Sequence, residues 1–310
     1  MPLLFSFGVI MRSNDNGLRT EREMPVGFLL CLHFVFIILQ GIWLGGISDP
    51  VVRITLSKIL QVLACLLPVV FYRYSGAPAT IKRKLRINCM PAFPMFFISL
   101  AVMCGALLIN VKLCELLSRF GVSYSVGGME LLPGVGGLVF ALFMYVLLPA
   151  VCEELFFRYA LLQSLGGGLY AVIISALCFS LMHFNLFGSI YTFVTGLVLG
   201  CTAIATGSLI LPVLLHGSMN GLALLLSYLA VKLDAPMYLQ VESIIWSVVF
   251  LGGVVFAVFT LLNFNRQQNE LVNLEKNTDE PAERRNTLTI LVPIIYIVAV
   301  AVWNLIRMIL

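Results

Sequence analysis

The sequence predicts an all-α, polytopic integral membrane protein, a helical bundle of about eight to nine transmembrane helices. Hydrophobic residues make up 60% of the 310 residues, charged residues make up only 11%, and the mean hydropathy is +1.02. An ordinary soluble domain carries about 25% charged residues. The composition therefore excludes a water-soluble globular fold and indicates a chain that contacts lipid along most of its length.

Nine apolar runs approach the length of about 20 residues that a helix needs to cross roughly 30 Å of hydrocarbon. They lie near residues 26–47, 54–72, 91–111, 135–162, 169–187, 189–205, 209–229, 241–263 and 288–306. The fifth and sixth runs are short and closely joined, so they are the weakest part of this prediction. We expect an N-terminal segment at 1–25 and one membrane domain at 26–310, with the polar motifs at about 135–230 and a polar loop at 264–287.

The distribution of Lys and Arg predicts the orientation of the chain. Basic residues gather in the segments 1–25, 73–90 and 264–287, and the loops between these segments hold few. With nine spans, all three basic segments fall on one side, which the positive-inside rule assigns to the cytoplasm. The N-terminus is therefore expected in the cytoplasm. The net charge of +4 is explained by this topology, and no nucleic-acid partner is expected.

Cysteine and the first histidine are interpreted as structural. The eight cysteines show no CxxC pairing, which favours small apolar packing residues over a redox or metal role. His33 lies inside the first apolar run without another polar motif, so we expect a hydrogen-bonded structural histidine.

The run PAVCEELFFRYALL at 149–162 places three charges inside an apolar span. A charged side chain at a helix centre costs about 2.5–3.5 kcal/mol on insertion scales, so function is the default explanation. Glu154 and Arg158 are four residues apart and can neutralise one another on one helix face. Glu153 points about 100° away, lacks that partner and suits a general base. An ion-pair cluster that only fixes helix packing explains this run, taken alone, equally well.

Two later motifs contain the other two of the three histidines in the chain. In FSLMH, Phe179 and His183 share a helix face, so the aromatic ring can restrict the orientation of the imidazole. In HGSMN, His216 and Asn220 are also four residues apart, on a later apolar run. The repeated spacing favours a functional site over isolated structural histidines.

Helix rise places four polar groups at similar depth in the membrane. Measured from the GGG turn at 166–168 and the TGS turn at 206–208, these groups lie roughly 12–21 Å along their helices. The four are Glu153, His183, His216 and Asn220. We therefore expect them to meet near the middle of the membrane, in a cavity that opens to the cytoplasm.

Small residues recur every four positions in the sixth apolar run, at Gly188, Thr192, Gly196 and Gly200. This spacing lets helices approach closely. It predicts close packing of the helices around the polar motifs rather than a ligand site.

The motifs EExxxR, FxxxH and HxxxN, in this order over about residues 135–230, resemble the CPBP family. This family comprises the CAAX proteases and bacteriocin-processing enzymes and is also called the Abi family. The resemblance implies an intramembrane endopeptidase in which Glu153 and His183 activate water and His216 and Asn220 bind the oxyanion. Glu154 and Arg158 would orient the site, with Phe179 packed beneath His183.

Two other chemistries are open for the same residues. Two histidines and a carboxylate can hold a catalytic zinc ion, and the ligands would be Glu153, His183 and His216. The spacing is not the HExxH of a zincin helix, so we expect a metal-free reaction without a cofactor. Cys152 or Ser218 as nucleophile is less favoured, because a buried apolar thiol is normally inert and the serine would need a partner base on another helix.

Two function classes compete with a protease. Intramembrane charges also form proton or substrate pathways in transporters, which are often built from repeated halves, and no such repeat is present. A noncatalytic membrane scaffold or immunity protein could keep the same fold. For a protease, the resemblance implies a membrane-associated protein or peptide substrate, which is prenylated in one branch of the family. The charge pattern selects no particular substrate.

Overall fold

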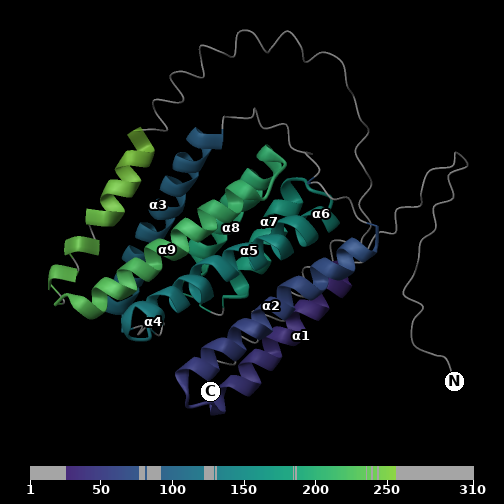
Figure 1. The fold of residues 1–310 in the computed structure, drawn as a ribbon. Coiled ribbons are helices and arrows are strands. Elements are labelled where there is room, and N and C mark those ends of the chain that lie inside the picture. The colour runs from purple at the N-terminus through teal and green to yellow at the C-terminus, as the bar shows by residue number, and fades with distance from the viewer. Residues whose placement is uncertain are drawn as a thin grey trace, which may run out of the picture.

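The computed structural model describes residues 26–76, 81, 92–121, 129, 131–183, 185, 187–234, 236–238, 240–242 and 244–255. All regular structure in these residues is helical (Figure 1). The expected N-terminal segment at 1–25, the polar loop at 264–287 and the ninth apolar run at 288–306 lie outside the described residues.

The helices follow the predicted apolar runs closely. They are α1 (Val26–Trp43), a 3₁₀ turn (Leu44–Gly46), α2 (Pro50–Tyr74), α3 (Ala92–Arg119), α4 (Gly134–Ala141), α5 (Leu148–Glu154), α6 (Leu162–Ser164), α7 (Leu169–Leu181), α8 (Ser189–Thr206) and α9 (Ile210–Lys232). The last apolar helix of the described residues covers Pro236–Val255. Two π-helical stretches, Leu142–Leu147 and Leu155–Leu161, join α4, α5 and α6 into one long helix, Gly134–Ser164.

Seven helices in the described part of the chain are long and apolar enough to cross a membrane. Large apolar side chains are exposed on their outer faces, among them Trp43, Val102, Val139 and Val231. Lipid can cover such side chains, whereas water would leave them unfavourably hydrated. The prediction of an all-α polytopic membrane bundle is confirmed.

The helix α7 is shorter than the predicted run at 169–187. It has 13 residues and ends at Leu181, and Met182 and His183 lie in a turn after it. Asn185 explains part of the difference, because its side-chain oxygen accepts a hydrogen bond from the backbone N–H of Gly188 at 3.0 Å. Such local bonds favour turns over a continuous helix. His183 therefore lies in the turn that follows α7 and not inside a helix.

Helix boundaries follow local capping chemistry. Asp49 accepts a hydrogen bond from the N–H of Val52 at 2.9 Å, and Pro50 begins α2. Gly207 ends α8 in the left-handed region with φ of 63°, and Gly166 lies in the turn before α7 with φ of 90°. Glycine adopts these angles without a Cβ clash, so the turns predicted at GGG and TGS are both present.

The long helix Gly134–Ser164 changes its hydrogen-bond pattern where its sequence demands it. Pro149 lacks an N–H and cannot make the usual bond to the preceding turn, and the π-helical stretch Leu142–Leu147 directly precedes its helix. The second π-helical stretch, Leu155–Leu161, follows the two glutamates and contains Arg158. Single π-helical turns of this kind occur often at functional sites.

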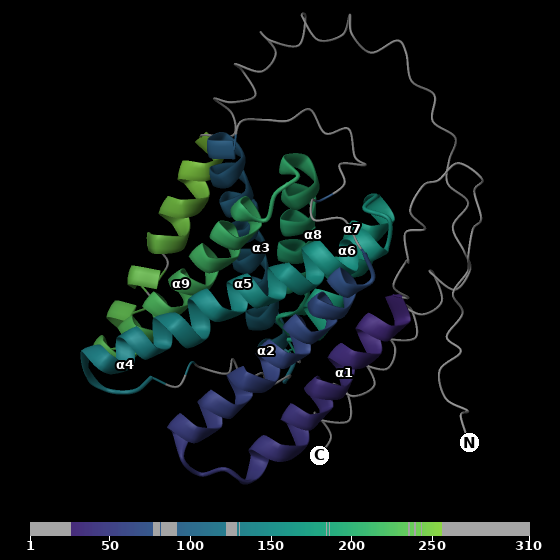
Figure 2. The same ribbon diagram turned by 45° about the vertical axis from the view of Figure 1, so that its right-hand side comes forward.

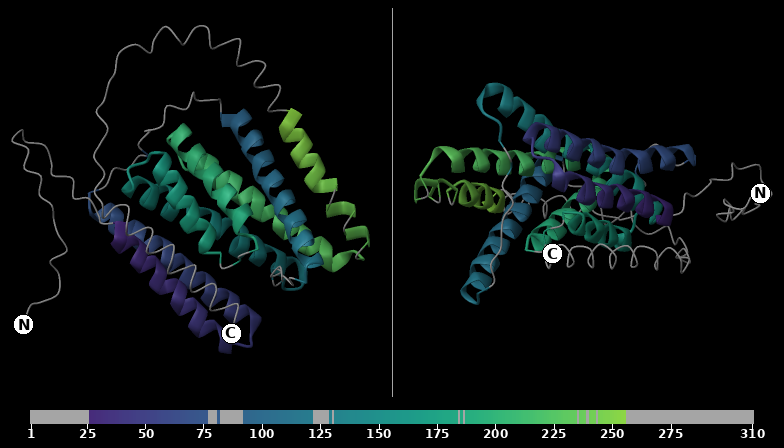
Figure 3. Two further views of the ribbon diagram at one scale, coloured as in Figure 1. Left: turned by 180° about the vertical axis from the view of Figure 1, so that it is seen from behind. Right: turned by 90° about the horizontal axis from the view of Figure 1, so that it is seen from below.

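Helices from several parts of the chain surround the polar motifs. Helices α1 and α2 lie side by side along one edge of the bundle (Figures 1 and 2). The long helix contacts α2 on one side and α9 on the other, and α8 packs against α3, α7 and α9. The last apolar helix runs beside α3 at the opposite edge, as the view from behind also shows (Figure 3). The end of α5 thereby lies between α2 and α9, and α8 contacts the π-helical stretch Leu155–Leu161 that follows it.

The small residues of α8 produce the close packing that their spacing predicts. A Cβ added at Gly196 would lie 2.9 Å from the Cα of Ala176 in α7, and one added at Gly200 would lie 3.1 Å from Val172. Real Cβ atoms rarely come this close to a backbone atom. The pair α7 and α8 is therefore held at a distance that only glycine permits.

We expect Gly196→Ala to destabilise the protein by about 1–3 kcal/mol, because the added methyl group overpacks the α7–α8 contact. The matched control is Gly136→Ala in α4, where an added Cβ meets no atom within 4 Å. Thermal unfolding in detergent, followed by tryptophan fluorescence, checks the prediction. Equal unfolding temperatures for the two variants would contradict it.

His33 and the described cysteines have the structural roles expected of them. The Nδ1 of His33 donates to the carbonyl of Ala64 at 2.9 Å, and its ring stacks on Phe156 with centroids 4.3 Å apart. The cysteines in the described residues carry free thiols, and most of them are buried. The prediction of packing residues is confirmed for those buried thiols.

Candidate active site

Two adjacent glutamates at the end of α5 form the centre of the site. Glu153 is 3% exposed, and Glu154 and Arg158 are completely buried. Burial of three ionisable groups inside an apolar bundle is unfavourable unless they compensate one another. The contacts of these three side chains therefore decide what the site can do.

Arg158 compensates Glu154. Its Nη1 lies 3.0 Å from Oε1 of Glu154, as the four-residue spacing predicts. Its Nη2 donates to the carbonyl of Gly196 at 3.4 Å, and the guanidinium lies 4.4 Å from the ring centroid of Phe179. A guanidinium over an aromatic face gains electrostatic attraction from the ring. The charge of Arg158 is thus balanced from α5, α7 and α8 together.

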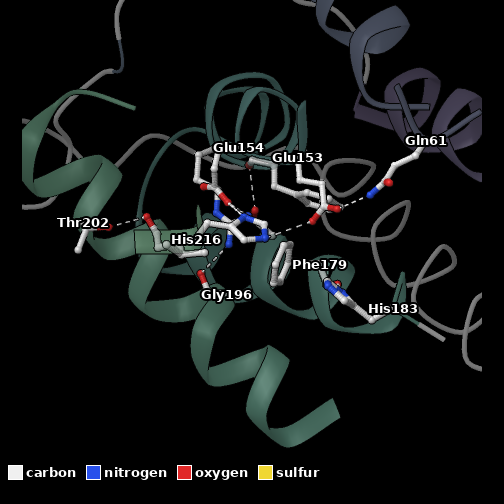
Figure 4. Close-up of polar contacts among 12 residues, drawn as sticks. Gln61, Glu153, Glu154, Phe179, His183, Gly196, Thr202 and His216 are labelled. Atoms are coloured by element: carbon white, nitrogen blue, oxygen red, sulfur yellow. Dashed lines mark hydrogen bonds and ion pairs between the residues drawn. The ribbon is translucent and has the colours of Figure 1, made fainter. Parts of the chain in front are cut away.

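His216 of α9 connects the two glutamates. Its Nδ1 donates to Oε1 of Glu154 at 2.9 Å, and its Nε2 lies 3.9 Å from Oε2 of Glu153 (Figure 4). Because a carboxylate only accepts, the first contact places a proton on Nδ1. Glu154 therefore orients the imidazole so that its other nitrogen faces Glu153.

The other carboxylate oxygen of Glu153, Oε1, accepts a hydrogen bond from a residue of α2. Nε2 of Gln61 donates to Oε1 of Glu153, and Nζ of Lys58 donates to Oε1 of Gln61 at 2.8 Å. Sequence reasoning did not select these two α2 residues. A signal was available, since Lys58 is a charged residue inside an apolar membrane span, and such residues are rare and usually functional.

Phe179 packs against both site histidines. Its ring centroid lies 4.7 Å from that of His183 and 5.6 Å from that of His216, edge to face in each case. Nδ1 of His183 donates to the carbonyl of Phe179 at 2.7 Å. A neutral His183 therefore leaves Nε2 as an acceptor. The expected contact between Phe179 and His183 is present.

His183 and Asn220 remain at the margin of the cluster. His183 is exposed in the turn after α7, and Asn220 is half-buried one helical turn beyond His216. Within the described residues, no hydrogen bond or ion pair joins either side chain to Glu153. The structure thus brings together Glu153, Glu154, Arg158 and His216, and it places His183 and Asn220 beside them without direct contact.

The zinc alternative needs three ligands that converge. Among the residues that the structure describes, no group of three His, Cys, Asp or Glu side chains has the spacing of a metal site. Glu153, His183 and His216 therefore do not form a ligand set in this conformation.

The fold and the cluster together define a polytopic helical membrane protein with a buried carboxylate–imidazole site. Residues 135–222 match the family model for the type II CAAX prenyl endopeptidase Rce1-like proteins. The matched segment is less than half of the chain, and it contains all three motifs. It confirms the resemblance of this segment to the CAAX-protease family. No curated protein and no solved structure matches the chain significantly.

Proposed function

We propose that the protein is an intramembrane endopeptidase that hydrolyses peptide bonds of a membrane-associated protein or peptide. The family match supports a CAAX-type intramembrane protease in general. The observation that carries the specific proposal is the pair formed by Oε2 of Glu153 and Nε2 of His216, 3.9 Å apart in the buried cluster. Water bound beside this pair would have a base and a proton donor within reach.

Glu153 is the general base of the proposed reaction. Oε2 has no hydrogen-bond partner within the described residues, whereas Oε1 is held by Gln61. Oε2 is therefore available to take a proton from water, while the resulting hydroxide attacks the carbonyl carbon of the peptide bond. His183 would accept a second hydrogen bond from the same water through Nε2, once substrate brings the turn after α7 against the cluster.

His216 and Asn220 are the proposed donors to the oxyanion. Donation from His216 requires a proton on Nε2 in addition to the proton that Nδ1 donates to Glu154. The side-chain amide of Asn220, one turn further along α9, would provide the second donor.

Collapse of the tetrahedral intermediate completes the reaction. The carbonyl is restored, the C–N bond breaks, and the proton held by Glu153 passes to the leaving amine. Glu153 returns to its ionised form, and the products are a carboxylic acid and an amine. Water is the only co-reactant.

We expect Asn220→Ala to lower kcat by about 10²- to 10³-fold, the usual cost of losing one oxyanion donor. The control is Ser227→Ala on the same helix, since the Ser227 hydroxyl donates to the carbonyl of Ala223 in its own helix. Steady-state cleavage of a quenched peptide in proteoliposomes measures both. An Asn220→Ala variant with unchanged kcat would remove Asn220 from the mechanism.

The proposed substrate is a lipidated C-terminal tail presented from the membrane. Apolar helices surround the site, so a lipid chain could remain in the bilayer while its peptide reaches Glu153. We also propose that the site opens to the cytoplasm, on the strength of the basic segments alone. Comparison of farnesylated and unlipidated peptides of one sequence tests the first point, and labelling of single cysteines from each side tests the second.

Chelation separates the metal-free reaction from the zinc alternative. We expect full activity in the presence of a strong chelator at neutral pH. Loss of activity with chelator and recovery on adding zinc would favour the zinc-dependent form of the same protease.

A further inference from the structure

We propose that Lys58 and Gln61 of α2 form a positioning relay that fixes the carboxylate of Glu153 for its role as general base. The inference rests on the proposed function, because it assigns these residues to the same site. It adds two positioning residues from a helix outside the family match, which begins at residue 135. Neither residue is expected to touch substrate.

The relay is a continuous chain of donors and acceptors. Nζ of Lys58 donates to Oε1 of Gln61 at 2.8 Å, and Nε2 of Gln61 donates to Oε1 of Glu153. Lys58 and Gln61 are three residues apart on α2, so they share one face of that helix. This face meets the end of α5, since α2 and α5 are in contact.

Lys58 and Glu153 select the same orientation of the Gln61 amide. An amide side chain carries one acceptor and one donor group, whereas an ammonium group has donors only. The ammonium of Lys58 can therefore bond only to the oxygen of Gln61, and the amide nitrogen must then face Glu153. The carboxylate of Glu153 only accepts, so it selects the same orientation, and Lys58 and Glu153 together hold the amide in one direction.

The relay selects which oxygen of Glu153 acts as the base. Gln61 holds Oε1, and Oε2 is left facing Nε2 of His216 at 3.9 Å. Lys58 is also placed by Tyr145 of the long helix, whose ring centroid lies 5.3 Å from Nζ. The cation is thus held by a residue of its own helix and by the long helix, as expected of a group that serves a fixed geometry rather than a solvated surface.

Kinetics of single and double variants test the relay in proteoliposomes, with quenched farnesylated and unlipidated peptides as probes. We expect Gln61→Leu to lower kcat by about 10- to 100-fold with KM little changed, the usual effect of losing a hydrogen bond to a charged group. Lys58→Met should lower kcat less. Lys58→Arg should restore most of the activity, because it keeps donors and charge.

The double variant and a matched control distinguish positioning from general damage to α2. If Lys58 acts through Gln61, adding Lys58→Met to Gln61→Leu causes no further loss of kcat. The control is Gln40→Leu, because Gln40 donates to Ser57 of α2 at 2.8 Å and makes no contact with Glu153. A loss of kcat after Gln40→Leu as large as that after Gln61→Leu would overturn the relay.

Thermal unfolding separates failure of the relay from failure of the proposed function. We expect the decreases in Tm for Lys58→Met and Gln61→Leu to be non-additive in the double variant, whether or not a peptide is cleaved. If the wild type cleaves no peptide and the Tm changes are non-additive, the peptidase proposal is rejected, whereas the contact between Lys58 and Gln61 is supported. Additive Tm changes, or an additive loss of kcat, would overturn the relay itself.

Discussion

Glu153→Gln is expected to lower kcat by about 10²- to 10⁴-fold, the range that a positioned general base contributes. Glutamine has the size of glutamate, so the contact with Gln61 and the packing of α5 can be kept. The amide cannot accept a proton from water at neutral pH. We therefore expect the variant to fold, to bind substrate and to fail in the chemical step.

The control for this substitution is Glu242→Gln in the last apolar helix. The carboxylate of Glu242 is hydrogen-bonded to the side chain of Tyr238 within that helix. Glu242 carries the same functional group as Glu153 but does not belong to the site. Cleavage rate and Tm are measured for both variants in the same membrane preparation. A Glu153→Gln variant that cleaves as fast as Glu242→Gln would reject Glu153 as the base.

Glu154→Ala is expected to destabilise the protein by about 3–5 kcal/mol, the usual cost of leaving a buried charge without its partner. Arg158 is completely buried, and Oε1 of Glu154 lies 3.0 Å from its Nη1. The same oxygen accepts from Nδ1 of His216, so the variant also loses the contact that orients the imidazole. Thermal unfolding in detergent should show a large decrease in Tm, and cleavage should be lost.

A double variant separates the stability effect from the catalytic one. Replacing both charges in Glu154→Leu/Arg158→Met removes the unpaired cation, and apolar replacement of a buried pair is often neutral or stabilising. We expect Tm to recover in the double variant while cleavage stays absent, because nothing then orients His216. Recovery of cleavage along with Tm would show that Glu154 serves packing alone.

Much of this arrangement could be predicted from the sequence because the membrane restricts the choices. Apolar runs of about 20 residues have to form helices there, and the glycines at 166–168 and 207 mark turns. The spacing of four residues predicted the pair of Glu154 with Arg158 and the contact of Phe179 with His183. These are local relations, which helix geometry sets within one element.

Contacts between helices could not be predicted in the same way. Sequence spacing gives no distance between α2 and α5, so the bond from Gln61 to Glu153 was missed. Helix rise placed His183 at the depth of Glu153, yet Asn185 and its turn end α7 at Leu181 and leave His183 exposed. Packing and turn chemistry decide these positions, and neither follows from hydrophobic periodicity.

Product analysis by mass spectrometry tests the central claim most directly. Purified wild-type protein in liposomes is incubated with farnesylated and unlipidated peptides of one sequence, with chelator present, beside Glu153→Gln. We predict two fragments whose summed mass exceeds that of a peptide by one water, from wild type alone. Absence of fragments from every peptide, with chelator or with added zinc, or equal fragments from Glu153→Gln, would contradict the account.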